Sequence, residues 1–109
     1  MVRKCGLNKY GQSDKAKAIR KLDAALSKLI RARDSACVTC GRGDVPLDAG
    51  HFRRRECMAT RFDCRDLAGQ CKKENRFEGG KPSEFGIAID TNFGKGTAQQ
   101  LFNLSQTTK

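Results

Sequence analysis

Residues 37–41 read Cys37-Val38-Thr39-Cys40-Gly41, and this stretch decides the fold that we predict for the 109-residue chain. A gap of two residues lets both sulfurs of one tight turn point at the same tetrahedral ion. Gly41 stands where such a turn often needs a positive φ, a conformation that glycine adopts at no steric cost. The stretch is therefore typical of a metal-binding knuckle, and we expect the ion to be zinc in a structural role.

A zinc knuckle is usually closed by a second pair of ligands from elsewhere in the chain. Cys71 supplies one sulfur, and the residue three positions further on is Glu74. Zinc accepts a carboxylate oxygen, so a site with three sulfurs and one carboxylate is chemically sound. The predicted zinc ligands are Cys37, Cys40, Cys71 and Glu74.

Two alternatives remain open at this stage. Cys57 or Cys64 is a competing candidate for the fourth ligand. The cysteines are otherwise free thiols in a reduced core, since Cys is among the more buried residue types. Cys5 stands alone near the N-terminus and is expected to bind no metal.

The composition predicts one small domain with a modest core. The hydrophobic fraction is 38%, there is no Trp, and 31% of the residues are charged. A chain of this size buries little apolar surface, so a metal staple would help it fold. The first basic residues are followed by no apolar run, and no stretch is long enough for a membrane span. We therefore expect no membrane partner and a cytoplasmic protein, in which reduced cysteines favour a metal site over a disulfide.

The charge balance predicts a polyanionic partner. Lys and Arg number 22 against 12 Asp and Glu, which leaves a formal net charge of +10. Residues 1–33 hold ten basic and two acidic side chains, and residues 51–76 hold eight and four. Such basic zones suit the sequence-tolerant phosphate contacts of nucleic-acid binding. The residues predicted to contact DNA are Arg53, Arg54, Arg55, Arg61, Arg65, Lys72, Lys73 and Arg76.

The pattern along the chain predicts a helix-rich α+β fold. Residues 1–12 look like a flexible basic arm, and residues 13–109 like a single domain. Ser13 is a good N-cap for an amphipathic helix over 14–33, whose apolar positions recur every three or four residues. Its apolar stripe consists of Ala16, Ile19, Leu22, Leu26, Leu29 and Ile30.

The remaining elements are predicted from turn formers and caps. The knuckle leads into a short β-hairpin, residues 51–65 are irregular, and a short helix starts near Gln70 and stops before Gly79. A further helix runs from Glu84 to about residue 92 and is closed by Gly94. Thr97, with a Gln three residues later, has the capping-box pattern of a last helix.

Several motifs in order resemble the NinG (Rap) recombination proteins of lambdoid phages, over roughly residues 26–104. The C-terminal part, ending in Asn92-Phe93-Gly94, is the weakest match. Their wider pattern is similar to the HNH, or ββα-metal, nucleases, which are built on a treble-clef zinc knuckle. The matching stretches are Leu29-Ile30-Arg31-Ala32-Arg33-Asp34, Cys37-x-x-Cys40-Gly41-Arg42, Ala49-Gly50-His51-Phe52, Ala59-Thr60-Arg61-Phe62-Asp63 and Gln70-Cys71-x-x-x-Asn75-Arg76-Phe77.

This resemblance implies a structure-specific endonuclease that hydrolyses phosphodiester bonds in branched DNA during recombination. It makes His51 the general base that activates water, Asp66 the residue that orients His51, and Asn75 a ligand of a catalytic Mg²⁺ or Mn²⁺. His51 is the chain's single histidine, and its intrinsic pKa suits general-base work.

The chain departs from the family pattern at four places. Glu74 replaces the fourth zinc cysteine, Asp66 replaces the usual asparagine, Ala68 replaces a frequent histidine, and Gly50 stands where many of these enzymes carry a metal-binding acid. These departures keep a second hypothesis open, a non-catalytic zinc-knuckle protein that binds DNA or RNA.

The sequence also leads to expectations about the aromatic residues, the substrate and the oligomeric state. Phe52, Phe62 and Phe77 are expected in the small core rather than stacked on bases. The substrate is branched or single-stranded DNA. Because an enzyme that cuts junctions must cleave two strands symmetrically, a homodimer is the expected state of a nuclease, with the 14–33 helix as its candidate interface.

Overall fold

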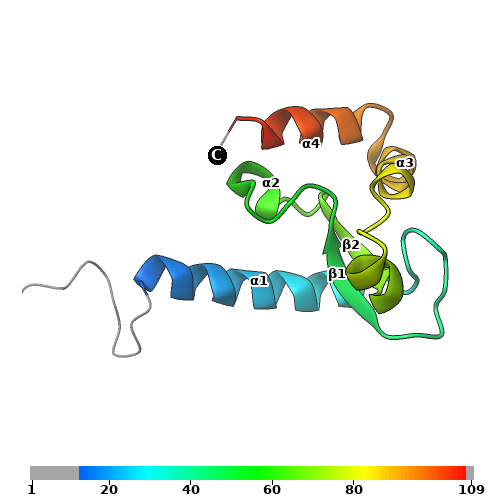
Figure 1. The fold of residues 1–109 in the computed structure, drawn as a ribbon, viewed down its shortest axis with the longest axis horizontal. Coiled ribbons are helices and arrows are strands. Elements are labelled where there is room, and N and C mark those ends of the chain that lie inside the picture. The colour runs from blue at the N-terminus through cyan, green and yellow to red at the C-terminus, as the bar shows by residue number, and fades with distance from the viewer. Residues whose placement is uncertain (1–12, 108–109) are drawn as a thin grey trace, which may run out of the picture.

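The computed structural model describes residues 13–107, so the predicted basic arm and Cys5 lie outside the described residues. The predicted α+β class is confirmed, with four α-helices, one π-helical turn and a two-stranded antiparallel sheet among these residues (Figure 1). The elements are α1 (Asp14–Arg33), β1 (Leu47–His51), α2 (Met58–Arg61), β2 (Leu67–Cys71), η1 (Lys73–Phe77), α3 (Pro82–Phe93) and α4 (Thr97–Ser105).

Helix α1 begins and ends where the sequence predicts. The Ser13 hydroxyl accepts a hydrogen bond from the Ala16 amide at 2.9 Å, and Asp14 lies in the first turn, near the positive end of the helix dipole. The apolar stripe is only partly buried, however. Ile30 is buried, whereas Leu22 and Leu29 are 52% and 57% exposed. The N-terminal part of α1 projects beyond the rest of the molecule (Figure 1).

The connection between the two strands of the sheet is longer than in the predicted hairpin. Strand β1 pairs with β2, with Leu47 opposite Cys71 and His51 opposite Leu67, and residues 52–66, which include α2, connect the strands. The predicted helix from Gln70 is wrong, because residues 67–71 form β2 and only residues 73–77 make a helical turn. The outer edge of β2 is closed by the knuckle, where the Val38 amide donates to the Gly69 carbonyl at 2.8 Å. These long-range hydrogen bonds outweigh the local preference for helix.

The two faces of the sheet pack against different helices. Ala68 lies in the main core with Phe85 and Ile89 of α3 and Leu101 of α4. Side chains alternate between the faces of a strand, so His51 and Leu67 lie on the opposite face, toward α1. Figure 1 shows α1 on one side of the sheet and α3 and α4 on the other.

The last two helices form as predicted, with one difference at a cap. Helix α3 extends to Phe93, and Gly94 follows with φ 112°. The capping box at Thr97 is wrong, because Gly96 is the N-cap and the Thr97 hydroxyl donates instead to the Gly94 carbonyl at 2.7 Å. Within residues 13–107, no helix has the length and apolar character that crossing a membrane requires.

Candidate functional site

The four predicted zinc ligands come together in the structure. The Sγ atoms of Cys37, Cys40 and Cys71 and a carboxylate oxygen of Glu74 all lie within 4.8 Å of one another. The Cys40 and Cys71 sulfurs are 3.9 Å apart, and the Cys37 sulfur is 3.7 Å from Glu74 Oε1. Tetrahedral zinc with ordinary bond lengths requires about 3.8 Å between two sulfurs and about 3.6 Å between sulfur and oxygen. The cluster therefore has the donor types and the spacing for a metal such as zinc.

The knuckle is shaped by its own backbone and by β2. The Gly41 amide donates to the Cys37 carbonyl at 2.8 Å, and Gly41 has φ 79°, as the sequence predicts. The bond from Val38 to Gly69 aligns the knuckle with β2, and Cys71 follows Gly69 by two residues on the same strand face. Glu74 then enters from the first turn of η1.

The thiols differ in their ease of ionisation. Burial opposes ionisation of Cys37, but the Thr39 hydroxyl and nearby backbone amides outweigh it and lower its pKa to about 7. A backbone hydrogen bond from Arg42 favours the Cys40 thiolate, but burial and the sulfurs of Cys37 and Cys71 raise its pKa to about 11. A cation at the centre of the cluster would favour the ionised form of every sulfur.

The two competing ligands lie elsewhere. Cys57 is the N-cap of α2 and Cys64 is an exposed loop residue. Among the described residues, neither belongs to a group of possible metal ligands. The Cys₃Glu arrangement is thus the one that the structure assembles.

A cleft of about 630 Å³ runs along the outer edge of β1. One wall comes from α1, and the other comes from η1 and the glycine turn that follows it. His51 and Asn75, predicted to act in catalysis, both line this cleft. Its other lining residues are Arg20, Asp23, Ala24, Leu26, Ser27, Ala49, Arg54, Arg55, Glu56, Leu67, Gly79 and Gly80.

His51 is half-buried at the end of β1. Burial lowers the pKa of its imidazole below the ordinary value of about 6.5, although a backbone hydrogen bond with Arg61 acts in the opposite direction. The ring is therefore neutral at pH 7. Its buried Nε2 atom has no hydrogen-bond partner among the described residues. A neutral imidazole that lines a cleft is able to accept a proton.

Asn75 is held from the side of β1. Its Nδ2 donates to Asp48 Oδ2 at 3.0 Å, which leaves its Oδ1 directed toward Gly50. A Cβ on residue 50 would lie 2.5 Å from Gln70 Oε1 and 3.1 Å from Asn75 Oδ1. A larger residue at position 50 would have to displace the Gln70 or Asn75 side chain, so glycine suits this position.

Asp66 does not orient His51 in this structure. The Asp66 side chain is fully buried, and its Oδ1 accepts a hydrogen bond from the Arg53 amide at 3.0 Å. The Phe52 amide donates to the Asp66 carbonyl, which continues the β ladder, so strand alternation puts Asp66 and His51 on opposite faces. Burial raises the pKa of Asp66 to about 7.

The eight basic residues predicted to contact DNA have different surroundings. Arg54 and Arg55 line the cleft. Arg61 is largely buried against Asp23 of α1, and Arg65 forms a bidentate pair with Asp63.

Arg53 serves the fold. Its Nε donates to Ser105 Oγ at 2.9 Å, and its guanidinium lies 4.6 Å from the centre of the Phe102 ring. Arg53, two residues after His51, therefore attaches the loop between β1 and β2 to α4.

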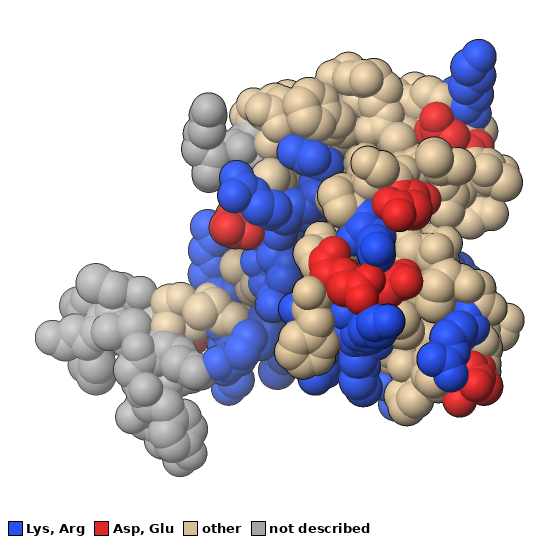
Figure 2. Space-filling model, turned by 45° about the vertical axis from the view of Figure 1, so that its right-hand side comes forward, with Lys and Arg blue, Asp and Glu red and all other residues tan. Residues whose placement is uncertain are grey.

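Lys72 and Arg76 share the carboxylate of Asp48, and Lys73 lies 3.6 Å from Glu78. All three side chains remain at least 45% exposed. Figure 2 shows Lys and Arg side chains gathered over the lower half of the molecule, while its upper part carries few of them.

Two acidic residues were missed by the sequence analysis. Asp23 binds Arg55 and Arg61 and so joins α1 to the loop beside His51. Its signal was its position on the apolar side of the helix, four residues after Ile19 and three before Leu26. Asp48 binds Asn75, Lys72 and Arg76, and no sequence spacing indicates that group.

Comparison with models of protein families, with curated proteins and with solved structures finds no match to this chain.

Proposed function

We propose that the protein is a metal-dependent endonuclease of the HNH kind that acts on branched or single-stranded DNA, as the resemblance to phage recombination proteins implies. One observation carries the proposal: His51 from β1 and Asn75 from η1 line the same cleft as Arg54 and Arg55. A base, an oxygen ligand and phosphate-binding groups are the parts that phosphodiester hydrolysis needs.

His51 would act as the general base. The lowered pKa keeps the imidazole neutral at physiological pH, so that Nε2 is ready to take a proton from a water molecule. Asp66 has no part in this step, since its carboxylate bonds to Arg53 on the other face of the sheet.

The oxygen donors in the cleft suit a hard divalent ion such as Mg²⁺ or Mn²⁺. Asn75 Oδ1 is available because Asp48 holds the amide nitrogen, and the exposed Glu56 lines the same cleft. When bound, such an ion stabilises the charge that develops on the departing oxygen. The chain's own part is to fix the Asn75 amide and to provide a carboxylate nearby.

Zinc at the Cys₃Glu cluster would have a structural role, as in a treble-clef knuckle. Its four ligands come from the knuckle, β2 and η1, so one ion would fasten the knuckle to the C-terminal end of β2 and to η1. Glu74 as a ligand also fixes η1, one residue before Asn75.

A second candidate, a non-catalytic zinc-knuckle protein that binds DNA or RNA, is favoured by a different observation. Asp66 bonds to the Arg53 amide and not to His51, so no carboxylate among the described residues orients the imidazole, which has a backbone hydrogen bond with Arg61 instead. The same basic surface would then bind phosphates without cutting.

Cleavage and binding assays separate the two candidates. Labelled four-way junction, single-stranded and duplex DNA are incubated with wild type or His51→Ala, with Mg²⁺, Mn²⁺ or a chelator. The nuclease proposal requires cutting that depends on the ion and disappears in His51→Ala, while binding stays within about twofold. Equal zinc content and circular dichroism of the two proteins control for folding. Binding of all three substrates by wild type, with no cutting under any ion, would establish the second candidate.

A further inference from the structure

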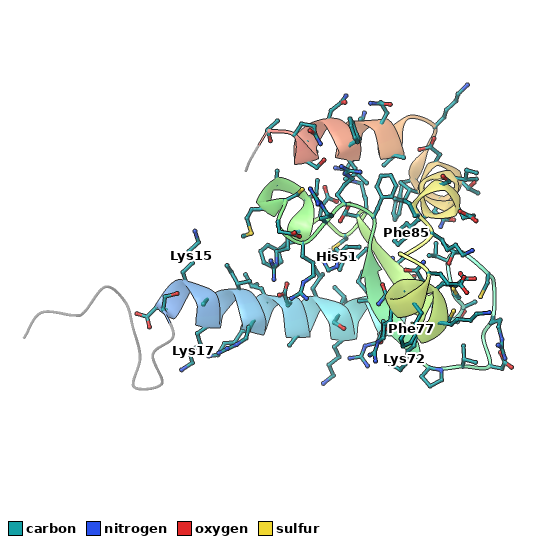
Figure 3. The ribbon with its side chains drawn as sticks, in the orientation of Figure 1. Lys15, Lys17, His51, Lys72, Phe77 and Phe85 are labelled. Carbon is teal, nitrogen blue, oxygen red and sulfur yellow. The ribbon has the colours of Figure 1, made fainter. Side chains whose placement is uncertain are left out.

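Phe77 lies on the surface, and its predicted place in the core is wrong. Its side chain is 82% exposed, the largest value among the exposed large hydrophobic residues of the described chain. Phe85, by contrast, is fully buried between the sheet and the last helices. Figure 3 labels both rings, with Phe77 at η1 and Phe85 near α3. A single exposed ring is ordinary by itself, so its meaning depends on where it lies and how it is held.

The backbone that carries Phe77 is fixed on both sides. Glu74 belongs to the metal cluster, and its carbonyl accepts a hydrogen bond from the Gly80 amide at 2.8 Å. Gly79 and Gly80 have φ angles of 68° and 80°, which turn the chain sharply after the ring. The Gly80 carbonyl in turn accepts from Gln70 Nε2 at 2.8 Å. The backbone at Phe77 therefore loses little conformational freedom when the ring binds a ligand.

Phe77 also stands beside the cleft. It lies two residues after Asn75 and two before Gly79, and both of these line the cleft with His51. Two peptide units span at most about 7.6 Å, so the Cα of Phe77 is within that distance of each. A strand whose phosphate lies at His51 and Asn75 would therefore pass close to the backbone of residue 77.

The surroundings of the ring are positively charged. Lys72 and Arg76 share one carboxylate, that of Asp48, and Lys73 and Lys81 share another, that of Glu78. These six side chains carry a net positive charge, four cations against two acids, which favours a polyanion over a basic protein partner.

We propose that Phe77 stacks on an unpaired base of a DNA strand that lies in the His51 cleft; this inference rests on the proposed function and names the substrate class of that site. The aromatic ring contributes a flat apolar face, and the cations around it contact the phosphates on either side of the base. Bases inside a duplex already cover one another's faces, so a protein ring reaches only unstacked ones. Phe77 thereby makes the surface selective for single-stranded segments and for the open centre of a branch.

Equilibrium binding of zinc-loaded protein to oligo-dT and to duplex DNA of equal length tests this inference. Phe77→Ala is expected to weaken oligo-dT binding about 5- to 150-fold, the range that loss of one stacked base produces, and duplex binding by less than twofold. Ile87→Ala is the matched control, because Ile87 is 69% exposed on α3, outside the cleft, and is expected to change neither affinity.

Phe77→Trp gives a direct spectroscopic measurement. The chain contains no Trp, so residue 77 would be its only indole. Its fluorescence is expected to be quenched by oligo-dT and much less by duplex, with wild-type affinity for oligo-dT retained. Unquenched fluorescence at saturating oligo-dT would overturn stacking even if Phe77→Ala had lost affinity through misfolding.

The outcomes distinguish this inference from the proposed function. If His51→Ala abolishes cutting but Phe77→Ala binds oligo-dT like wild type, the nuclease stands and stacking fails. If wild type cuts nothing but Phe77→Ala loses oligo-dT binding selectively, stacking stands and the nuclease fails. Equal losses on duplex and oligo-dT, or a change in sedimentation without a change in DNA binding, would overturn stacking, the latter in favour of a protein contact.

Discussion

The side-chain amide of Asn75 donates a hydrogen bond to the carboxylate of Asp48, with Nδ2 3.0 Å from Oδ2. Lys72 and Arg76 bind the same carboxylate. Burial opposes ionisation of Asp48, but these three donors outweigh it and lower its pKa to about 2. Asp48 is therefore ionised at neutral pH and fastens η1 to β1, with the amide oxygen of Asn75 turned toward Gly50.

Asp48→Ala should lower both stability and cleavage. The change removes charge-assisted hydrogen bonds and releases the Asn75 amide, so the free energy of unfolding should fall by about 1–3 kcal/mol. Urea unfolding of the zinc-loaded proteins measures this. Asp44→Ala is the matched control, because Asp44 is exposed and pairs with Arg42 at the surface, so its loss should leave the free energy of unfolding nearly unchanged. Equal stability of the two variants would contradict the assigned role of Asp48.

Glu74→Cys should tighten metal binding. The Glu74 oxygen lies 3.7 Å from the Cys37 sulfur, within the spacing of a tetrahedral site, so a fourth thiolate would complete a Cys₄ set. With Co²⁺ as a spectroscopic probe, thiolate charge-transfer absorption should increase in Glu74→Cys and decrease in Cys71→Ser. Zinc analysis should give one ion per chain for wild type. Unchanged absorption in Cys71→Ser would show that Cys71 is not a ligand.

The sequence was informative where local chemistry determines the structure. The spacing of Cys37 and Cys40 predicted the knuckle, and the position three residues after Cys71 identified Glu74. Capping by Ser13 and apolar periodicity predicted α1. Strand β2 was missed because residues 67–71 are short and lack alternation, and their hydrogen-bond partners lie around residues 34, 38 and 50.

The arrangement of the site depended on contacts that no local pattern encodes. Asp66 stands where the resemblance to HNH nucleases expects the residue that orients the histidine, yet strand alternation turns it away from His51. Phe77 was predicted in the core because the sequence around it does not show that the turn at Gly79 and Gly80 leaves the ring exposed on the surface. Three-dimensional placement decided both cases.

Asp66→Asn should stabilise the protein increasingly as pH rises. The folded-state pKa of Asp66 is about 7, above its unfolded value of about 3.9. The free energy of unfolding of the wild type therefore falls as pH rises between these two values, and falls no further above pH 7. Asparagine keeps an oxygen for the Arg53 amide and carries no charge. Its advantage in the free energy of unfolding should grow by about 2–3 kcal/mol between about pH 5 and pH 8.

The same variant also tests catalysis. Because Asp66 does not touch His51, Asp66→Asn should retain cleavage within a few-fold of wild type. A loss of cleavage rate comparable to that of His51→Ala, with unchanged stability, would show that Asp66 takes part in catalysis.

Neighbouring arginines should separate into structural and binding classes. Arg54→Gln should weaken DNA binding a few-fold and reduce the dependence of log K on log salt concentration by about 1, because Arg54 lines the cleft. Arg53→Gln should instead lower the free energy of unfolding by about 1–2 kcal/mol, because it loses Ser105 and the Phe102 ring. Fluorescence anisotropy over a salt series and urea unfolding measure the two effects. A reversal of the two phenotypes would contradict the structure.

Single-turnover cleavage of a labelled four-way junction with Mg²⁺ or Mn²⁺ tests whether His51 is the general base of the proposed endonuclease. For wild type, burial lowers the His51 pKa, so the rate should rise with pH through a pKa below about 6.5 and then level off. His51→Ala should lose at least about 100-fold in rate, and added imidazole should restore part of it. Cutting by His51→Ala at the wild-type rate, without imidazole, would show that His51 is not the general base.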